Sequence, residues 1–320
     1  MNKEDLKIVF MGTPEIASGI LRDLNANGFN VVLGVCQPDK PVGRKQILTA
    51  PPVKNTLDEL GIPSYQPNSL KNDEAFETIS SYEPNLIITC AYGKILPKAV
   101  LDIPALGCLN VHASLLPAKR GSAPVQRAIL DGDKETGVTI MKMDEGLDTG
   151  DIVSSVAVPI DDDIHSDELF ELVGKAGSKL LTETVMPYCN GELSLIKQDE
   201  SLATYCPPIK SEEGKISWDD TSFMIHKKVH ALSTWPGAFT FLGGKKVKIY
   251  DTTLIDESLI PEDVRDVAPG TVVKANKRDL FVKCGEGYLG INVLQTEGGK
   301  KLNAIDCAHN FRVGQSFQDQ

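Results

Sequence analysis

Short apolar runs and longer amphipathic segments alternate along roughly the first 190 residues of the chain. Runs that are apolar throughout are typical of strands buried on both faces of a sheet. Segments whose apolar residues recur every three or four positions predict helices that bury one side. The pattern predicts strands within 6–12, 29–36, 84–93, 107–114 and 136–160, the last as two strands joined by a turn, and helices within 13–28, 53–61, 74–83, 123–132 and 167–189.

Strands and helices that alternate in this way favour a parallel sheet covered by helices on both faces. We therefore predict an α/β fold with a doubly wound, Rossmann-like and mostly parallel sheet. The first helix is expected to begin with Thr13 as its N-cap and Pro14 at its first position. The same turn, "FMGTPEIASG", lacks the glycine pattern that holds a dinucleotide phosphate, which argues against an NAD(P) enzyme.

The amino-acid composition of the chain changes near residue 190. A polar stretch with adjacent prolines, Pro207 and Pro208, has the composition of a linker. Beyond it the pattern predicts one helix and then short strands separated by Gly and Asn/Asp turns, which favours a small OB-like β-barrel. We predict one domain over 1–190, a linker over 191–209 and a β-barrel domain over 210–320.

Composition narrows the class of protein. The chain has 320 residues, 41% of them hydrophobic and 24% charged, with a net charge of −11. No apolar run is long enough to span a membrane, and the N-terminus does not resemble a targeting peptide, so we expect a cytoplasmic protein without membrane contact. The seven cysteines include no closely spaced pair of the zinc-binding kind, which favours reduced, buried thiols.

One predicted strand carries polar residues where the pattern calls for apolar ones. In "CLNVHAS", Asn110 and His112 share one face of the strand, because alternate side chains point the same way. The carboxyl end of such a strand is where ligands bind in open α/β sheets. From the strand alone, a core pair in which the two side chains satisfy each other is an equal alternative.

A later loop supplies a carboxylate. Asp148 lies between Gly146 and Gly150 in "MDEGLDTGDIV", after a strand that we expect to neighbour the Asn110 strand. A carboxylate can orient an imidazole and take a proton, while an imidazole and an amide can stabilise an oxyanion. Because no Ser or Cys has the context of a nucleophile elbow, the trio suggests direct acyl transfer without a covalent enzyme intermediate and without a metal.

The stretches "NVHASLLPAKRGSAPVQRAI" and "ETGVTIMKMDEGLDTGDIV" resemble the 10-formyltetrahydrofolate-dependent formyltransferases, whose signature is "SLLP" followed by "RG". The likeness covers nearly the whole chain. "FMGTPEIA", "QPDKPVGRKQ" and "AYGKILPKAVLDIP" point to the branch that formylates methionyl initiator tRNA for translation initiation. The resemblance implies 10-formyltetrahydrofolate as formyl donor, that tRNA as acceptor, and no obligate protein partner.

The resemblance also assigns roles to individual residues. It implies a catalytic trio, a folate-lining segment and one tRNA contact in the loop after the second strand. These are Asn110, His112 and Asp148 for catalysis, Ser114, Leu115, Leu116 and Pro117 for folate, and Arg44 for tRNA.

Lysines in the C-terminal part come in pairs, such as Lys245 and Lys246. They could form a basic face that follows a phosphate backbone or could serve solubility alone. His226 and His230 lie one helical turn apart, but without a third ligand nearby in the sequence we expect them to be packing or surface residues. Formyltransferases that act on glycinamide ribonucleotide or on a sugar-nucleotide amine, and a catalytically silent folate- or RNA-binding protein, remain alternatives.

Overall fold

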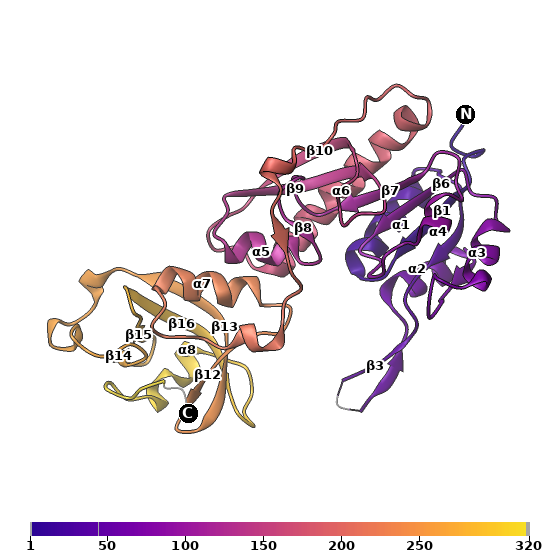
Figure 1. Ribbon diagram of the computed structural model, residues 1–320. Coiled ribbons are helices and arrows are strands. Elements are labelled where there is room, and N and C mark those ends of the chain that lie inside the picture. Colours follow the sequence, from indigo (N-terminus) through magenta and orange to yellow (C-terminus); the bar gives the residue numbers. More distant parts are fainter. Residues whose placement is uncertain (1, 44, 318–320) are drawn as a thin grey trace. The chain divides into compact units, whose positions relative to one another are not determined.

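The computed structural model describes residues 2–43 and 45–317, which form two compact units (Figure 1). The first unit extends to Pro124 and also includes Glu135–Pro159 and Phe170–Pro207. The second contains Val125–Lys134, Ile160–Leu169 and the chain from Pro208 onward. Two short segments that precede the predicted linker thus group with the chain from Pro208 onward, and the domain limits given above stay a prediction.

The first unit is built on a seven-stranded sheet in the order β10-β9-β7-β6-β1-β2-β5. Strands β7, β6, β1, β2 and β5 are parallel, whereas at one edge β9 pairs antiparallel with β7 and β10 pairs antiparallel with β9. The predicted mostly parallel, Rossmann-like sheet is confirmed. The strands are β1 (Ile8–Gly12), β2 (Val31–Val35), β5 (Ser64–Tyr65), β6 (Leu86–Cys90), β7 (Cys108–His112), β9 (Glu135–Lys142) and β10 (Ile152–Pro159).

Helices cover both faces of this sheet. On one face Gly34 of β2 lies so close to Leu57 that a Cβ at Gly34 would collide with it. On the same unit's long helix, Gly177 lies against side chains of two strands. On the other face Ile79 and Val100 join a buried apolar cluster with strand residues. The helices of this unit are α1 (Glu15–Ala26), α2 (Pro52–Leu60), α3 (Asp73–Ser80), α4 (Lys98–Leu101) and most of α6 (Ser166–Cys189), with the 3-10 helix η1 (Glu200–Leu202).

The start of α1 differs from the sequence prediction. Pro14, not Thr13, occupies the N-cap position, and it makes no side-chain capping bond. The Thr13 hydroxyl instead donates to the carbonyl of Tyr92 at 2.9 Å. A tertiary hydrogen bond has therefore replaced the local cap that the sequence suggested.

A small hairpin, β3 (Lys40–Val42) and β4 (Ile47–Thr49), extends from the first unit after β2 (Figure 1). Its apolar side chains are exposed, including Val42, Ile47 and Leu48. Arg44, the predicted tRNA contact, lies outside the described residues.

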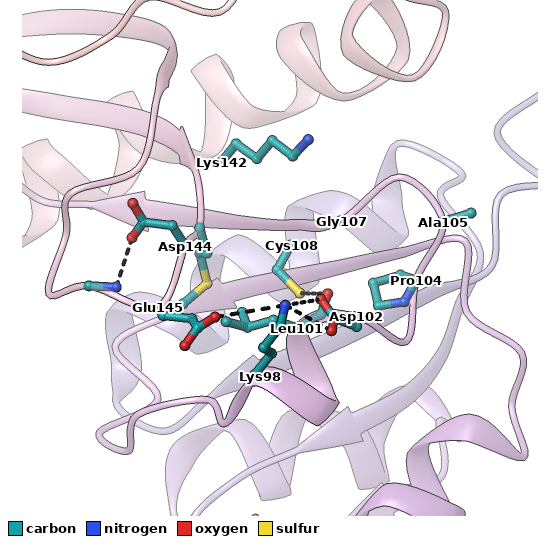
Figure 2. A pocket seen from close by; sticks show the side chains of 12 residues that line it. Lys98, Leu101, Asp102, Pro104, Ala105, Gly107, Cys108, Lys142, Asp144 and Glu145 are labelled. Atoms are coloured by element: carbon teal, nitrogen blue, oxygen red, sulfur yellow. Dashed lines mark hydrogen bonds and ion pairs between the residues drawn. The ribbon is translucent and has the colours of Figure 1, made fainter.

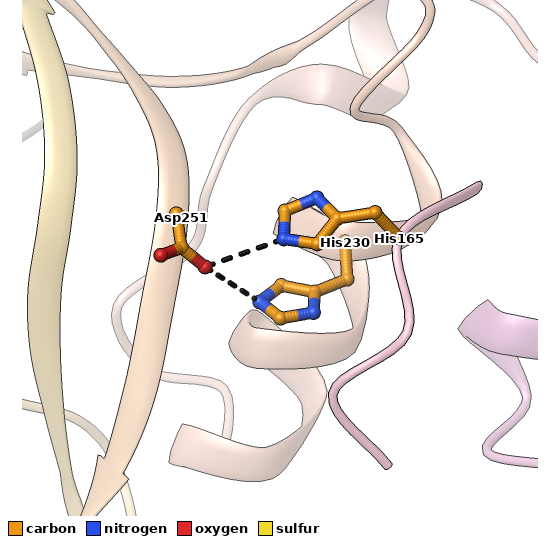
Figure 3. Close-up of side chains that lie close together, drawn as sticks. All are labelled: His165, His230 and Asp251. Atoms are coloured by element: carbon orange, nitrogen blue, oxygen red, sulfur yellow. Dashed lines mark hydrogen bonds and ion pairs between the residues drawn. The ribbon is translucent and has the colours of Figure 1, made fainter. Parts of the chain in front are cut away.

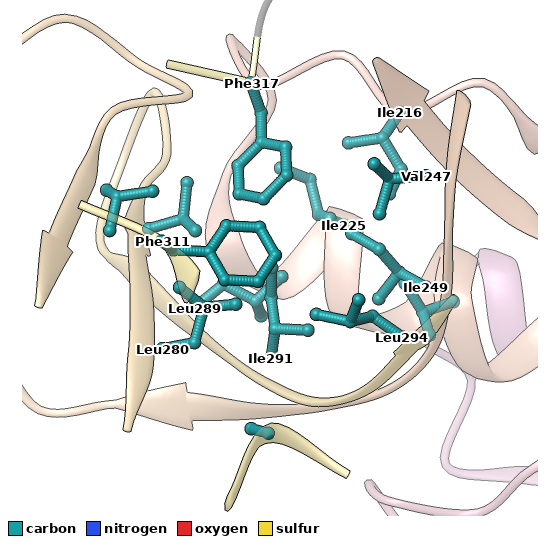
Figure 4. Close-up of a cluster of buried hydrophobic side chains, with 14 of the residues drawn as sticks. Ile216, Ile225, Val247, Ile249, Leu280, Leu289, Ile291, Leu294, Phe311 and Phe317 are labelled. Atoms are coloured by element: carbon teal, nitrogen blue, oxygen red, sulfur yellow. The ribbon is translucent and has the colours of Figure 1, made fainter. Parts of the chain in front are cut away.

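The second unit contains an antiparallel sheet with its own apolar core. Figure 4 shows Ile225 of α7 packed with strand residues and with Phe311 and Phe317 from the C-terminal segment. The separate C-terminal domain of short strands is confirmed as an antiparallel sheet, whereas its closure into the predicted OB-like β-barrel stays a prediction. Its elements are α5 (Pro124–Leu130), η2 (Ser211–Gly214), α7 (Ser222–Ala231), β12 (Ala238–Leu242), β13 (Lys245–Ile255), η3 (Glu257–Leu259), η4 (Glu262–Val264), β14 (Val272–Ala275), β15 (Leu280–Lys283), β16 (Tyr288–Thr296), β17 (Leu302–Asn303), α8 (Ala304–Cys307) and η5 (Ala308–Asn310).

The stretch expected to be a linker is bonded into the first unit over part of its length. Strand β11 (Tyr205–Cys206) pairs in parallel with β8 (Arg120–Gly121), which closely follows the predicted folate-lining segment. Among the described residues, no helix combines the length and the apolar character that crossing a membrane requires.

Candidate active site

Strand β7 presents Asn110 and His112 as the period-two pattern predicted, with Leu109 and Val111 buried between and around them. The Thr89 hydroxyl on neighbouring β6 donates to Asn110 Oδ1 at 2.8 Å. This bond fixes the amide, because the oxygen is taken and the NH₂ group must face the other way.

Asp148 comes back to this pair from the loop after β9, which neighbours β7 as expected and runs antiparallel to it. Asn110 Nδ2 lies 3.4 Å from Asp148 Oδ1, and His112 Nδ1 lies 3.6 Å from Asp148 Oδ2. The Gly121 backbone N–H donates to Asp148 Oδ2 at 2.8 Å. The side chains of His112 and Asp148 are only 6% and 13% exposed. The structure thus brings the three predicted catalytic residues together.

The His112 ring has a defined tautomer. Its Nε2 lies 3.0 Å from the carbonyl oxygen of Lys119. A carbonyl can only accept, so Nε2 carries the hydrogen. In the neutral ring, Nδ1 then offers its lone pair toward Asp148, and a proton taken from a substrate can reside between the two groups.

The loop around Asp148 has a conformation that few sequences allow. Asp148 has a φ of +54°, in the left-handed region that is unfavourable for most side chains. A Cβ at Gly150 would collide with the Lys142 carbonyl, so glycine is required there. The glycines seen in the sequence therefore allow the loop to turn the Asp148 carboxylate inward.

Two residues that hold this loop were missed in the sequence. Gln198 Nε2 donates to the carbonyls of Asp148 and Gly150 at 2.8 and 2.7 Å. Gln198 Oε1 in turn accepts from the guanidinium of Arg120, whose side chain is fully buried. Arg120 also forms an ion pair with Glu200 at 2.7 Å. Nothing in the pattern near residue 198 signals these contacts; only the "RG" of the signature segment marks Arg120.

The Arg120 guanidinium shifts the pKa of the Glu200 carboxylate. Its hydrogen bond with Arg120 lowers the pKa of Glu200 from the ordinary value, and the same bond is the main reason that the pKa of Arg120 is raised. Both groups therefore remain charged near neutral pH. The pair closes the network that runs from Glu200 through Arg120 and Gln198 to the backbone of Asp148.

The predicted folate-lining segment forms the turn between β7 and β8. The Ser114 hydroxyl donates to the Ala118 carbonyl at 2.7 Å, and the Leu116 N–H donates to the Thr139 hydroxyl at 3.1 Å. The Leu115 side chain lies against Gly137. These bonds set the shape of the segment, while its contacts with folate stay a prediction.

A cleft of about 710 Å³ lies close by, at the amino end of β7 and the carboxyl end of β9 (Figure 2). Lys98 lies on one of its walls, paired with Asp102 at 3.1 Å and with Glu145 at 3.7 Å. Of the described residues that line this cleft, none belongs to the predicted catalytic trio. The trio therefore stays the candidate site of the reaction.

A Rossmann-like sheet with an amide, an imidazole and a carboxylate at one strand defines an α/β enzyme of the acyl-transfer type. Comparison with family models makes this specific. Residues 6–185 match the formyl transferase model, and residues 208–312 match the model of the formyl transferase C-terminal domain. The chain belongs to the formyl transferase family.

Relatives of similar length carry a more specific name. Methionyl-tRNA formyltransferase of Caldicellulosiruptor saccharolyticus is 44% identical over 310 residues, which cover 96% of this chain and 98% of the relative. Methionyl-tRNA formyltransferase of Halalkalibacterium halodurans is 43% identical over 302 residues, covering 94% and 93%.

Solved structures share the fold at lower identity. HypX from Aquifex aeolicus, in complex with tetrahydrofolic acid, superimposes with a TM-score of 0.65 at 18% identity, covering 93% of this chain and 46% of HypX. The N-formyltransferase from Helicobacter canadensis, in complex with folinic acid and dTDP-3-aminofucose, gives a TM-score of 0.64 at 18% identity, covering 89% and 98%.

Proposed function

We propose that this cytoplasmic chain transfers the formyl group of 10-formyltetrahydrofolate to the free amino group of methionyl initiator tRNA. The observation that carries the proposal is the contact of Asp148 with both Asn110 and His112. It occurs in a chain that is 44% identical, over nearly its full length, to a relative named for this reaction.

In the proposed reaction the amine attacks the formyl carbon and the carbonyl oxygen becomes an oxyanion. An amide nitrogen carries two N–H groups, so Asn110 can donate to Asp148 and to this oxyanion together. Thr89 keeps the NH₂ group on the correct side. Once the His112 ring has taken up the proton of the attacking amine, it places a positive charge near the developing oxyanion.

Proton transfer completes the proposed reaction. The attacking nitrogen loses a proton to the His112–Asp148 pair, directly or through a water. The bond between the formyl carbon and the folate nitrogen breaks, and the His112–Asp148 pair passes its proton to that nitrogen as it leaves. The products are the formylated amine and tetrahydrofolate, so the enzyme residues return to their initial state.

Two features support tRNA as the acceptor. The β3–β4 hairpin exposes Val42, Ile47 and Leu48, and it carries Lys40 and Lys45 as exposed basic residues. In the second unit the Lys pairs lie on an antiparallel sheet domain of the kind used to bind single-stranded nucleic acid. A small-molecule acceptor would not need the exposed hairpin.

The test compares acceptors. Purified chain is incubated with 10-formyltetrahydrofolate and either charged initiator tRNA, glycinamide ribonucleotide or an amino-sugar nucleotide. We expect formylation of the tRNA alone. Transfer to either small amine instead would overturn the proposed substrate but not the proposed chemistry, and transfer to none of the three would favour a silent binding protein.

A pair of variants tests the site. Asp148→Asn keeps the shape of the side chain but cannot take a proton, and we expect turnover to fall by about 100-fold or more. Glu145→Gln is the matched control, because this exposed carboxylate of the same loop forms an ion pair only with Lys98, at 3.7 Å, among the described residues. Equal loss in both variants would assign the effect to the loop and not to Asp148.

A further inference from the structure

Three chemically reactive side chains meet in the second unit, apart from the active site. His165 comes from the residue before α6, His230 from the end of α7 and Asp251 from β13. One ligand atom of each lies within 4.8 Å of the other two. Figure 3 shows both imidazole rings directed at the same carboxylate oxygen. No step of the proposed reaction uses these residues.

The hydrogen bonds of His230 leave its inner nitrogen without a partner. Nδ1 lies 2.9 Å from the backbone carbonyl of Asp163, so it must carry the hydrogen and donate. In the neutral ring Nε2 therefore carries no hydrogen and has a lone pair that can only accept or coordinate. This atom is buried and has no hydrogen-bond partner among the described residues. Its nearest polar neighbour is Asp251 Oδ1, at 3.4 Å.

Two electron-rich atoms that face each other in a buried site repel unless a positive charge lies between them. His165 Nε2 is also directed at Asp251 Oδ1, at 3.3 Å. A proton on one of the two rings can form a hydrogen bond in only one of the two nitrogen–oxygen contacts. A metal ion would satisfy both rings and the carboxylate together.

The surroundings fix the carboxylate and one of the rings. β13 has register irregularities on both sides of Asp251, and bulges of this kind re-aim a side chain. Asn292 Nδ2 donates to Asp251 Oδ2 at 3.1 Å, and the Thr252 N–H donates to Oδ1 at 2.9 Å. An amide on the outer carboxylate oxygen and a carbonyl on the outer histidine nitrogen are the supports that metal ligands commonly have.

We propose that His165, His230 and Asp251 bind a divalent transition-metal ion, with Zn²⁺ as the best fit. Zinc bonds of about 2.0–2.1 Å in tetrahedral geometry place neighbouring ligand atoms about 3.3 Å apart. The distances from His165 Nε2 and His230 Nε2 to Asp251 Oδ1, 3.3 and 3.4 Å, match this separation between ligand atoms. Two imidazoles and one carboxylate suit zinc better than Mg²⁺ or Ca²⁺, which prefer oxygen ligands.

The ion would have a structural role. It would join the segment before α6 to α7 and β13, all within the second unit. The His165 side chain is 24% exposed, so water can occupy the fourth position. The His226 ring lies beside that of His230, tilted by 43° with ring centroids 4.0 Å apart. Its Nε2 is directed at Asp163 Oδ1, at 3.1 Å, and it is not among the ligands.

The full chain, stripped of metal with a chelator, is titrated with Zn²⁺ in competition with a chromophoric chelator. We expect one tightly bound Zn²⁺ per chain. His165→Ala and Asp251→Asn should each weaken binding by at least about 100-fold. The matched control is His309→Ala, which removes an exposed histidine of the same unit. Co²⁺ should give the intense visible bands of a four-coordinate site in the unsubstituted chain and lose them in His165→Ala.

Formyl transfer by the variants separates binding from folding. Because His165 is partly exposed and lies outside the active site, its alanine variant should fold and remain active. Stoichiometric Zn²⁺ binding of unchanged affinity in both ligand variants would overturn the proposal. So would the failure of the metal-free chain to bind Zn²⁺ in competition with the chelator, and the cluster would then be a proton-bridged pair of His165 and Asp251.

Discussion

Gln198 offers the sharpest test of how the Asp148 loop is held. Gln198→Ala removes two donated hydrogen bonds, of 2.8 and 2.7 Å, to the carbonyls of Asp148 and Gly150. It also removes the oxygen that accepts from Arg120 at 2.9 and 3.0 Å. A neutral bond is worth about 1 kcal/mol and a charge-assisted one about 2 kcal/mol. Gln198 is half-buried and water can replace part of this, so we expect a loss of about 2–3 kcal/mol in the free energy of unfolding.

Catalysis should suffer more than this loss suggests. Asp148 has an unfavourable backbone conformation that its neighbours impose. Without Gln198 the loop can relax, and a displacement of about 1 Å at a catalytic group can lower the rate about 100-fold. We expect kcat to fall by that order, with little change in KM for the folate, because Gln198 positions Asp148 and is not itself a binding residue.

Two further variants identify the cause. Gln198→Glu can still accept from Arg120 but cannot donate to the two carbonyls, so it should have the low kcat of the alanine variant. Gln295→Ala removes a similarly bonded glutamine of the second unit, which accepts from the Tyr250 hydroxyl at 2.8 Å and donates to the Gly299 carbonyl at 2.9 Å. It should lose stability without losing kcat. Unfolding in urea and steady-state kinetics measure both quantities, and a normal kcat in Gln198→Ala would refute the positioning role.

Three other outcomes are expected. Gly121→Ala should lower both the thermal midpoint and kcat, because Gly121 has a φ of +124° and a Cβ there would collide with the Cys206 carbonyl; a normal kcat would mean that its bond to Asp148 is dispensable. Replacing Lys245 and Lys246 together by alanine should reduce the salt dependence of tRNA affinity by about one unit of slope per lost phosphate contact, measured by binding at several salt concentrations, and an unchanged slope would leave these lysines a solubilising role. Burial raises the pKa of the Cys90 thiol from 9.0 to about 12, so the unfolded chain loses this proton at lower pH than the folded chain. The free energy of unfolding should therefore fall by about 1.4 kcal/mol per pH unit between 9.0 and about 12. Urea unfolding of Cys90→Ala should show a smaller fall in this free energy over the same pH range.

Short-range patterns in the sequence determined the elements and one half of the site. Period-two alternation placed Asn110 and His112 on one face of a strand, and the apolar runs predicted a buried parallel sheet, because both depend on neighbours only a few residues away. The paired glycines around Asp148 indicated a loop able to turn inward. The cap of the first helix was predicted wrongly at Thr13, since a partner in a distant segment, Tyr92, competed for its hydroxyl.

Only the tertiary structure decided which distant segments meet. The bonds from Gln198 to Asp148 and from Arg120 to Glu200 join parts of the chain separated by 50 and 80 positions. The helical spacing of His226 and His230 was visible in the sequence, yet the partners that make His230 a candidate ligand are His165 and Asp251, aimed by a helix start and a strand irregularity. Periodicity records how each segment buries its own apolar face, whereas such encounters depend on the packing of all the segments together.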